Sequence, residues 1–108
     1  MRILTTAAII VATAVSATSA FAQTSKRISD VDFIRANRCA SLATASGVSN
    51  ATTFSNVVAR QSRGRDEVIV GMARKAGDKA ANQVRYANDE RRASLQAELD
   101  GACQKFAG

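Results

Sequence analysis

Residues 29–46, SDVDFIRANRCASLATAS, carry the pattern that decides the fold. Ser29 is a favoured helix N-cap, and Asp30 and Asp32 place negative charge in the first turn, where the helix dipole stabilises it. Gly47 then supplies a stop signal. The apolar side chains recur three and four residues apart, at Phe33, Ala36, Ala40 and Ala43, with Cys39 beside them. This stretch therefore predicts an amphipathic helix that carries a cysteine at its middle.

The chain beyond this stretch repeats the same start and stop signals. Asn50, the Asp66-Glu67 pair and the Asn88-Asp89-Glu90 run each precede a segment with helical apolar spacing, and no Pro occurs anywhere. We predict an all-α fold, a small bundle of about four helices at 29–46, 50–62, 66–87 and 89–106. The last two could instead form one helix of about 40 residues; we prefer the break, because one long helix would leave its apolar stripe uncovered.

The apolar spacing also predicts which side chains face inward. The second helix offers Phe54, Val57, Val58 and Gln61; the third offers Ile69, Met72, Ala73, Ala76, Ala80, Val84 and Ala87; the fourth offers Leu95, Leu99, Ala102, Cys103 and Phe106. Gly71 and Gly77 are candidate kinks or close-contact points in the third helix. Tyr86 is expected to be a half-buried packing residue.

Residues 1–22 are typical of a secretory leader. Arg2 precedes an Ala- and Ile-rich apolar run, which Thr and Ser interrupt before it reaches the ~20 apolar residues that a bilayer span needs. Small residues at Ala20 and Ala22 suit cleavage after Ala22, and the composition is that of bacterial export. We therefore expect a protein that is periplasmic or secreted, with a mobile tail at 23–28, one helical domain at 29–108 and no stable membrane span after cleavage.

Cys39 and Cys103 are the only cysteines in the chain. In an exported protein an even cysteine count indicates a disulfide, whereas a redox pair would usually show Cys-x-x-Cys spacing. Bulky apolar residues are few, so a core built from these helices is thin and needs a covalent tie. Closing a loop of about 65 residues would stabilise the fold by roughly 4 kcal/mol. We predict an intramolecular Cys39–Cys103 bond that fastens the first helix to the last.

The residue types present argue against catalysis and metal binding. The chain contains no His, the usual general base and transition-metal ligand. The acidic pairs lie at predicted helix starts, where they interact with the helix dipole, and Glu98 and Asp100 point to different sides of one helix. We therefore predict no catalytic residues, no metal site, no cofactor and no enzymatic activity.

Positive charge is the remaining functional signal. The chain has 15 Lys and Arg against 9 Asp and Glu. Arginine predominates, and its planar fork suits bidentate contacts with carboxylates and phosphates. The candidate anion-binding residues are Arg60, Arg63, Arg65, Arg74, Lys75, Arg91 and Arg92. The alternative is that these side chains only solvate the domain and pair with acidic neighbours. Nucleic acid is not an expected partner, because aromatic residues for base stacking are almost absent.

These features favour a non-catalytic binding protein of the bacterial envelope. We expect an adaptor, an envelope-stress factor or an inhibitor that contacts an acidic protein or an envelope polymer, as a monomer or a homodimer. In its layout of leader, short helical domain and one disulfide between distant helices, the chain resembles the small acid-stress chaperones of the periplasm, which would imply a chaperone role. A membrane-active secreted protein is a further alternative, although no segment combines a broad bulky apolar face with a lysine-rich one.

Overall fold

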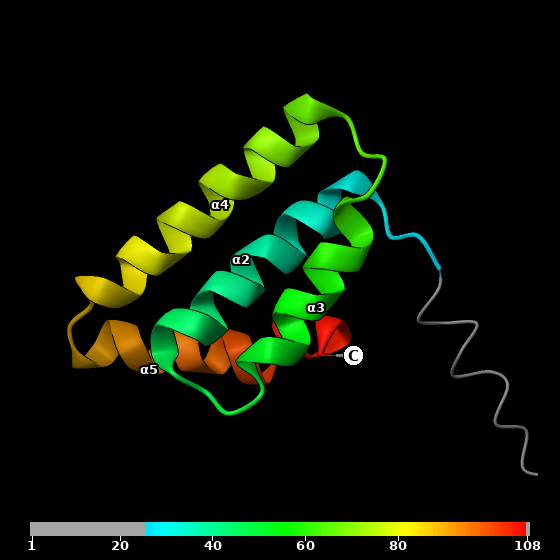
Figure 1. Ribbon diagram of the computed structural model, residues 1–108. Coiled ribbons are helices and arrows are strands. Elements are labelled where there is room, and N and C mark those ends of the chain that lie inside the picture. The colour runs from blue at the N-terminus through cyan, green and yellow to red at the C-terminus, as the bar shows by residue number, and fades with distance from the viewer. Residues whose placement is uncertain (1–25, 108) are drawn as a thin grey trace, which may run out of the picture.

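The computed structural model describes residues 26–107, and these form an all-helical domain without strands. The leader predicted over 1–22 and residues 23–25 of the predicted tail lie outside the described residues. The elements, labelled as in Figure 1, are α2 (Asp30–Ser46), α3 (Ala51–Ser62), α4 (Glu67–Arg85), α5 (Asp89–Asp100) and the short 3-10 helix η1 (Ala102–Phe106). The predicted bundle of four helices is confirmed, and so is the break between the third and fourth helices.

Side-chain caps account for three of the four helix starts. The Ser29 hydroxyl accepts a hydrogen bond from the Asp32 amide at 3.1 Å. Asp66 accepts one from the Val68 amide, and Asn88 accepts one from the Arg91 amide. Each cap satisfies a backbone N–H that has no partner within its own helix. The residues predicted from the sequence to start these helices therefore do so by hydrogen bonds from the backbone to their side chains.

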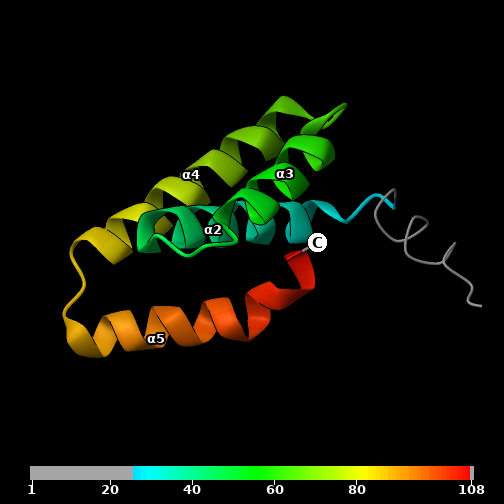
Figure 2. The ribbon, with the colours of Figure 1, turned by 60° about the horizontal axis from the view of Figure 1, so that its bottom comes forward.

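The helices are arranged around α2. In Figures 1 and 2, α3 runs back antiparallel to α2, a loop then crosses over, and α4 runs parallel to α2 on its other flank. The chain turns once more, and α5 returns beneath the layer of the first three helices, with η1 ending against α2. The α2 helix contacts every other element. The stretch that carries the clearest sequence signals is thus the centre of the fold.

Small residues let α4 approach α2 closely. Ala73, Gly77 and Ala80 are the buried positions of α4. A Cβ atom placed on Gly77 would lie only 2.6 Å from the Oγ atom of Ser41 on α2. No atom lies within 4 Å of the corresponding position at Gly71. Gly77 is therefore a close-contact point, and Gly71 is not.

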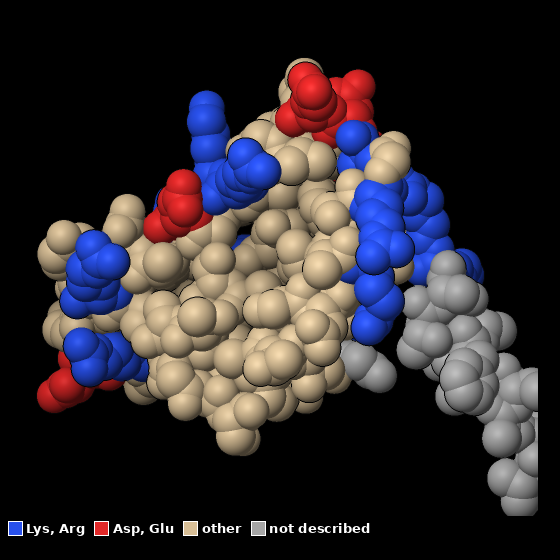
Figure 3. Space-filling view, in the orientation of Figure 1, with Lys and Arg blue, Asp and Glu red and all other residues tan. Residues whose placement is uncertain are grey.

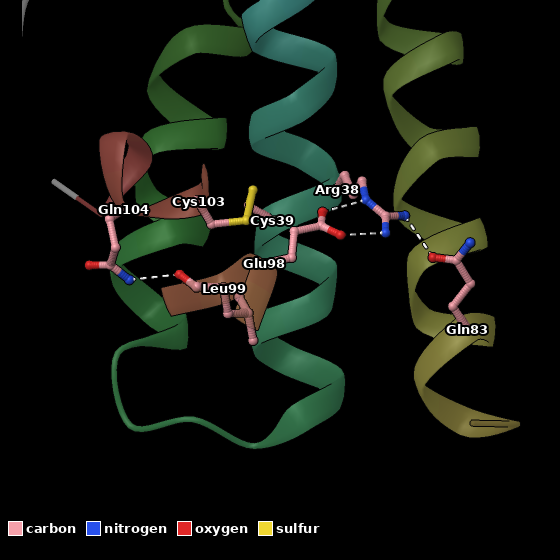
Figure 4. The surroundings of a disulfide bond; sticks show 7 residues. All are labelled: Arg38, Cys39, Gln83, Glu98, Leu99, Cys103 and Gln104. Atoms are coloured by element: carbon pink, nitrogen blue, oxygen red, sulfur yellow. Dashed lines mark hydrogen bonds and ion pairs between the residues drawn. A yellow bond between two sulfur atoms is a disulfide. The ribbon is translucent and has the colours of Figure 1, made fainter. Parts of the chain in front are cut away.

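The predicted disulfide joins the two ends of the domain. The Cys39 and Cys103 sulfur atoms are bonded, with Cα atoms 5.6 Å apart. Figure 4 shows the bond bridging α2 and the segment that follows α5. Both cysteines belong to the buried core, together with Ala36, Leu42, Ala43, Phe54, Ala80, Leu95, Leu99 and Phe106. The bond thus passes through the core itself.

The last helix is shorter than predicted. Instead of continuing to residue 106, α5 ends at Asp100, and η1 carries Cys103 and Phe106. Gly101 has φ −108° and ψ −93°, outside the α-helical region, so the chain changes direction there. In a 3-10 helix, side chains three residues apart lie on the same face. The turn therefore directs both Cys103 and Phe106 into the core, where each is buried.

Three predicted packing residues lie at the surface. Tyr86, expected to be half-buried, is 78% exposed, and Met72 is 50% exposed. Met72 lies roughly 100° around α4 from Ala73, so the close α2–α4 contact turns it away from α2. Ala102 is also exposed, because the direction change at Gly101 removes it from the inner face of α5.

Candidate functional site

Gln61, at the end of α3, binds the backbone of the segment that precedes α2. Its Nε2 atom donates to the Lys26 carbonyl at 3.0 Å, and its Oε1 atom accepts from the Ile28 amide at 3.1 Å. The Gln61 side chain is buried, and these two bonds satisfy both ends of its amide. Residues 26–28, part of the tail expected from the sequence to be mobile, are thereby hydrogen-bonded to the domain.

Arg65 completes this contact from the loop between α3 and α4. Its side chain is only 2% exposed. The guanidinium donates to the Ile28 carbonyl at 2.6 Å, to the Gln61 carbonyl at 2.7 Å and to the Asp30 carboxylate at 2.7 Å. It also lies over the Phe33 ring, 4.6 Å from the centroid. Arg65 was a predicted anion-binding residue, but its guanidinium is buried and bonds groups of the protein itself.

We name Gln61, Arg65 and the backbone that they bind the Gln61–Arg65 clamp. The clamp brings basic side chains from separate segments to one end of α3. Arg27 donates to the Arg63 carbonyl at 3.0 Å, which fixes the two residues beside each other. Arg60 lies one turn before Arg63 on α3, and Lys26 is held through its carbonyl by Gln61.

We name Lys26, Arg27, Arg60 and Arg63 the N-terminal basic cluster. All four are exposed, and none forms an ion pair with a carboxylate of residues 26–107. Figure 3 shows a band of basic side chains along this edge of the molecule. Arg60 and Arg63 were predicted from the sequence as anion-binding residues, whereas Lys26 and Arg27 were not. The signal for these two was Gln61, a polar residue on a predicted inner face.

The other predicted anion-binding residues lie elsewhere. Arg74 and Lys75 are exposed in the middle of α4, and Arg91 and Arg92 are exposed in the first turns of α5. Figure 3 shows smaller basic groups over α4 and over the α4–α5 corner, with acidic side chains next to them. The seven predicted residues therefore do not form one site.

Arg38 links α2 to both α4 and α5. It forms a bidentate pair with Glu98, with bonds of 2.7 and 2.9 Å, and its third donor reaches the Gln83 amide oxygen at 2.8 Å. Figure 4 shows this network beside the disulfide. The hydrogen bonds from Arg38 lower the pKa of Glu98, and the same bonds raise the pKa of Arg38. The network is a structural tie between three helices.

Hollows lie at several places on the surface of residues 26–107, and three of them bear on function. One of about 420 Å³ lies beside the disulfide, and its only carboxylate is Glu98, which is paired with Arg38. Another of about 370 Å³ lies between α2, α3 and α4 and has small, uncharged side chains in its lining. A third of about 320 Å³ lies at the α4–α5 corner and contains arginines without a carboxylate. None of these three hollows offers the two facing carboxylates that glycoside hydrolysis requires.

Two further properties concern metals and membranes. Among residues 26–107, no group of three or more Cys, Asp and Glu side chains is placed to hold a metal ion. None of the helices in the same range has both the length and the hydropathy needed to cross a bilayer.

Comparison of the chain with protein-family models, with curated proteins and with solved structures finds no match.

Proposed function

We propose that the protein is an exported, non-catalytic binding protein of the bacterial envelope that holds an acidic partner through the N-terminal basic cluster. Export rests on the leader-like pattern of residues 1–22. Binding rests on one observation. Four exposed cations from two separate segments meet at one edge, and no carboxylate of residues 26–107 pairs with them.

The Gln61–Arg65 clamp supports this proposal. Burying polar groups is unfavourable unless they are hydrogen-bonded, and here the buried groups hold the segment that carries Lys26 and Arg27. Gln61 and the Arg65 guanidinium are both withdrawn from water, and each bonds backbone atoms of the segment before α2; Arg65 also bonds the Gln61 carbonyl and the Asp30 carboxylate. The result is that Lys26 and Arg27 are presented at a fixed place next to α3. A cluster that is ordered before binding loses less conformational entropy when a partner arrives.

The chemistry of the cluster defines the class of partner. Three of its four members are arginines, whose forks pair with carboxylate or phosphate groups. A single exposed ion pair contributes only about 0–1 kcal/mol, so binding requires several contacts at once. The partner must therefore present repeated or clustered anionic groups, as an acidic protein surface or an anionic envelope polymer does. Such binding weakens steeply as salt is added.

Titration with fluorescent polyglutamate tests the proposal. The triple variant Arg27→Gln, Arg60→Gln and Arg63→Gln is expected to bind at least about tenfold more weakly than the parent, because several charged contacts are lost together. The matched control is Arg74→Gln, Lys75→Gln and Lys79→Gln on α4, which removes the same net charge from exposed positions. The control is expected to bind almost as the parent does. Equal weakening of both triple variants would refute the proposal, since net charge alone would then explain binding.

A further inference from the structure

The hollow at the α4–α5 corner lies where α2 and α4 end, whereas the N-terminal basic cluster lies where α2 begins and α3 ends (Figure 1). It is formed where the ends of α2 and α4 meet the beginning of α5, and its volume is about 320 Å³. Its lining consists of Ala45, Ser46, Val84, Arg85, Arg92, Leu95 and Gln96. We name this hollow the corner pocket.

Arg85 and Arg92 are the only charged residues that line the corner pocket. They come from two different helices, and neither forms an ion pair with a carboxylate of residues 26–107. The hollow beside the disulfide is different. There Arg38 is paired with Glu98 and Lys105 is paired with Asp32, so only Arg35 has no ion pair with a carboxylate of residues 26–107. The corner pocket therefore has the greater excess of unpaired positive charge.

The backbone that carries the two arginines is fixed at the corner, and Arg92 also has a side-chain contact. The Nε atom of Arg92 donates to the Ala87 carbonyl at 3.2 Å, which leaves both Nη groups of Arg92 available. The turn between the helices is itself fixed, because the Ala87 amide bonds the Val84 carbonyl and Asn88 caps α5. Arg85 and Arg92 thus belong to rigid elements whose relative position does not depend on a long loop.

The remaining lining combines an apolar floor with polar groups. Val84 is half-buried and offers apolar surface within the pocket, and Leu95, which is 3% exposed, adds a small area beside the core. The Ser46 hydroxyl adds a hydrogen-bonding group, and the Gln96 amide adds another although one of its N–H groups bonds Asp100. Small-molecule sites commonly have this composition of apolar walls and a few polar groups.

We propose that the corner pocket binds a small phosphate monoester, with the phosphate between Arg85 and Arg92 and the organic part against Val84 and Leu95. A phosphate monoester has three terminal oxygens and can accept bonds from two guanidinium groups together, whereas one fork already satisfies a carboxylate. This site goes beyond the function proposed above, because it uses different residues and a different class of ligand.

The test uses the oxidised protein and phenyl phosphate as the probe. Titration is followed by NMR, through the Nε–Hε signals of the arginines. Saturable shifts are expected at Arg85 and Arg92, and inorganic phosphate is expected to bind more weakly because it lacks the apolar part. The variant Arg85→Gln with Arg92→Gln is expected to lose at least about tenfold in affinity, in line with the loss of charged hydrogen bonds.

The matched control is Arg74→Gln with Lys79→Gln, which removes the same charge from the exposed face of α4. It is expected to bind phenyl phosphate as the parent does. Three results would overturn the proposal: no saturable shift, equal weakening in both double variants, or a response only to anionic lipid vesicles. A merely structural role is the competing explanation, since Arg85 lies in the last turn of α4 and can stabilise its dipole. In that case the variant with Arg85→Gln would melt at a lower temperature than the parent, and phenyl phosphate would change the melting temperature of neither the parent nor the variant.

The two proposals fail independently. Loss of polyglutamate binding in the Arg27, Arg60 and Arg63 variant leaves the corner pocket intact, and the Arg85 and Arg92 variant leaves the N-terminal basic cluster intact. Each titration can therefore contradict its own proposal alone.

Discussion

Two of the sides of α2, the α4 flank and the α5 flank beneath the layer of α2, α3 and α4, are held in different ways (Figure 2). On one flank α4 lies parallel to α2 and touches it through the small residues Ala73, Gly77 and Ala80. On the other flank α5 and η1 make fewer contacts with α2, through larger side chains such as Leu99 and through the disulfide. Figure 2 shows α5 set apart from the layer that contains α2 and α4.

This difference shows two solutions to the shortage of bulky apolar residues. Along α4, close approach of the backbones gives many weak dispersion contacts although each side chain is small. Against α5, the helices stand further apart, so a few large side chains fill the space and a covalent bond limits the entropy of the unfolded chain. We therefore expect the α4 flank to be sensitive to added volume and the α5 flank to be sensitive to loss of the bond.

Loss of the disulfide is expected to have the largest effect. The double variant Cys39→Ala with Cys103→Ala should have a free energy of unfolding about 4 kcal/mol lower than that of the parent, because the bonded cysteines are 64 positions apart in the sequence. Chemical denaturation measures this change, and reduction of the parent protein should reproduce it. Hydrogen exchange should show α5 and η1 losing protection before α4 does. An unchanged free energy of unfolding in both experiments would show that the disulfide does not stabilise the fold.

Added volume at the α2–α4 contact is expected to have the next largest effect. Gly77→Val should destabilise the protein by about 2 kcal/mol, because the added carbon atoms meet Ser41 in a contact that has no spare room. Gly71→Val is the matched control on the same helix and should remain within about 0.5 kcal/mol of the parent. Thermal unfolding of both variants makes the comparison. Similar costs at the two positions would show that helix propensity, not the close contact, explains Gly77.

A smaller effect is expected from the ion pair that joins the two flanks. Glu98→Gln should lower the free energy of unfolding by about 1 kcal/mol at neutral pH. The effect is this small because both side chains of the pair are partly exposed to water. The folded state lowers the pKa of Glu98 below its ordinary value of 4.5. The stabilisation from this carboxylate is therefore complete above that value and is lost as the pH falls through the lower, folded pKa. The difference between parent and variant should shrink over that acidic range, and a difference that stayed constant with pH would contradict this role.

The smallest effect is expected at Tyr86, which is 78% exposed at the end of α4. Tyr86→Ser should change the free energy of unfolding by no more than about 0.5 kcal/mol, since little buried surface is lost. The same denaturation experiment provides the measurement. A larger loss would mean that Tyr86 packs against the domain in solution, as its sequence context led us to expect.

The candidate sites were less predictable than the helices. Helix starts depend on a residue and its neighbours two or three positions away, so Ser29, Asp66 and Asn88 could be recognised directly. The Arg38–Glu98 pair joins residues 60 positions apart, and the Arg65 guanidinium reaches Ile28 across 37 positions. No local pattern marks such contacts. For the same reason, Arg85 drew no attention in the sequence, although it lines the corner pocket together with Arg92.

The amino-acid sequence alone determined the helical class, the places where helices begin and the pairing of the two cysteines, since these follow from local hydrogen bonding and from there being a single possible partner. Tertiary structure decided which face of each helix is covered, why Gly77 and not Gly71 lies in a close contact, and which cations meet. The physical reason is that helical periodicity fixes directions around an axis, whereas the distance and orientation between axes depend on the packing of all the helices together.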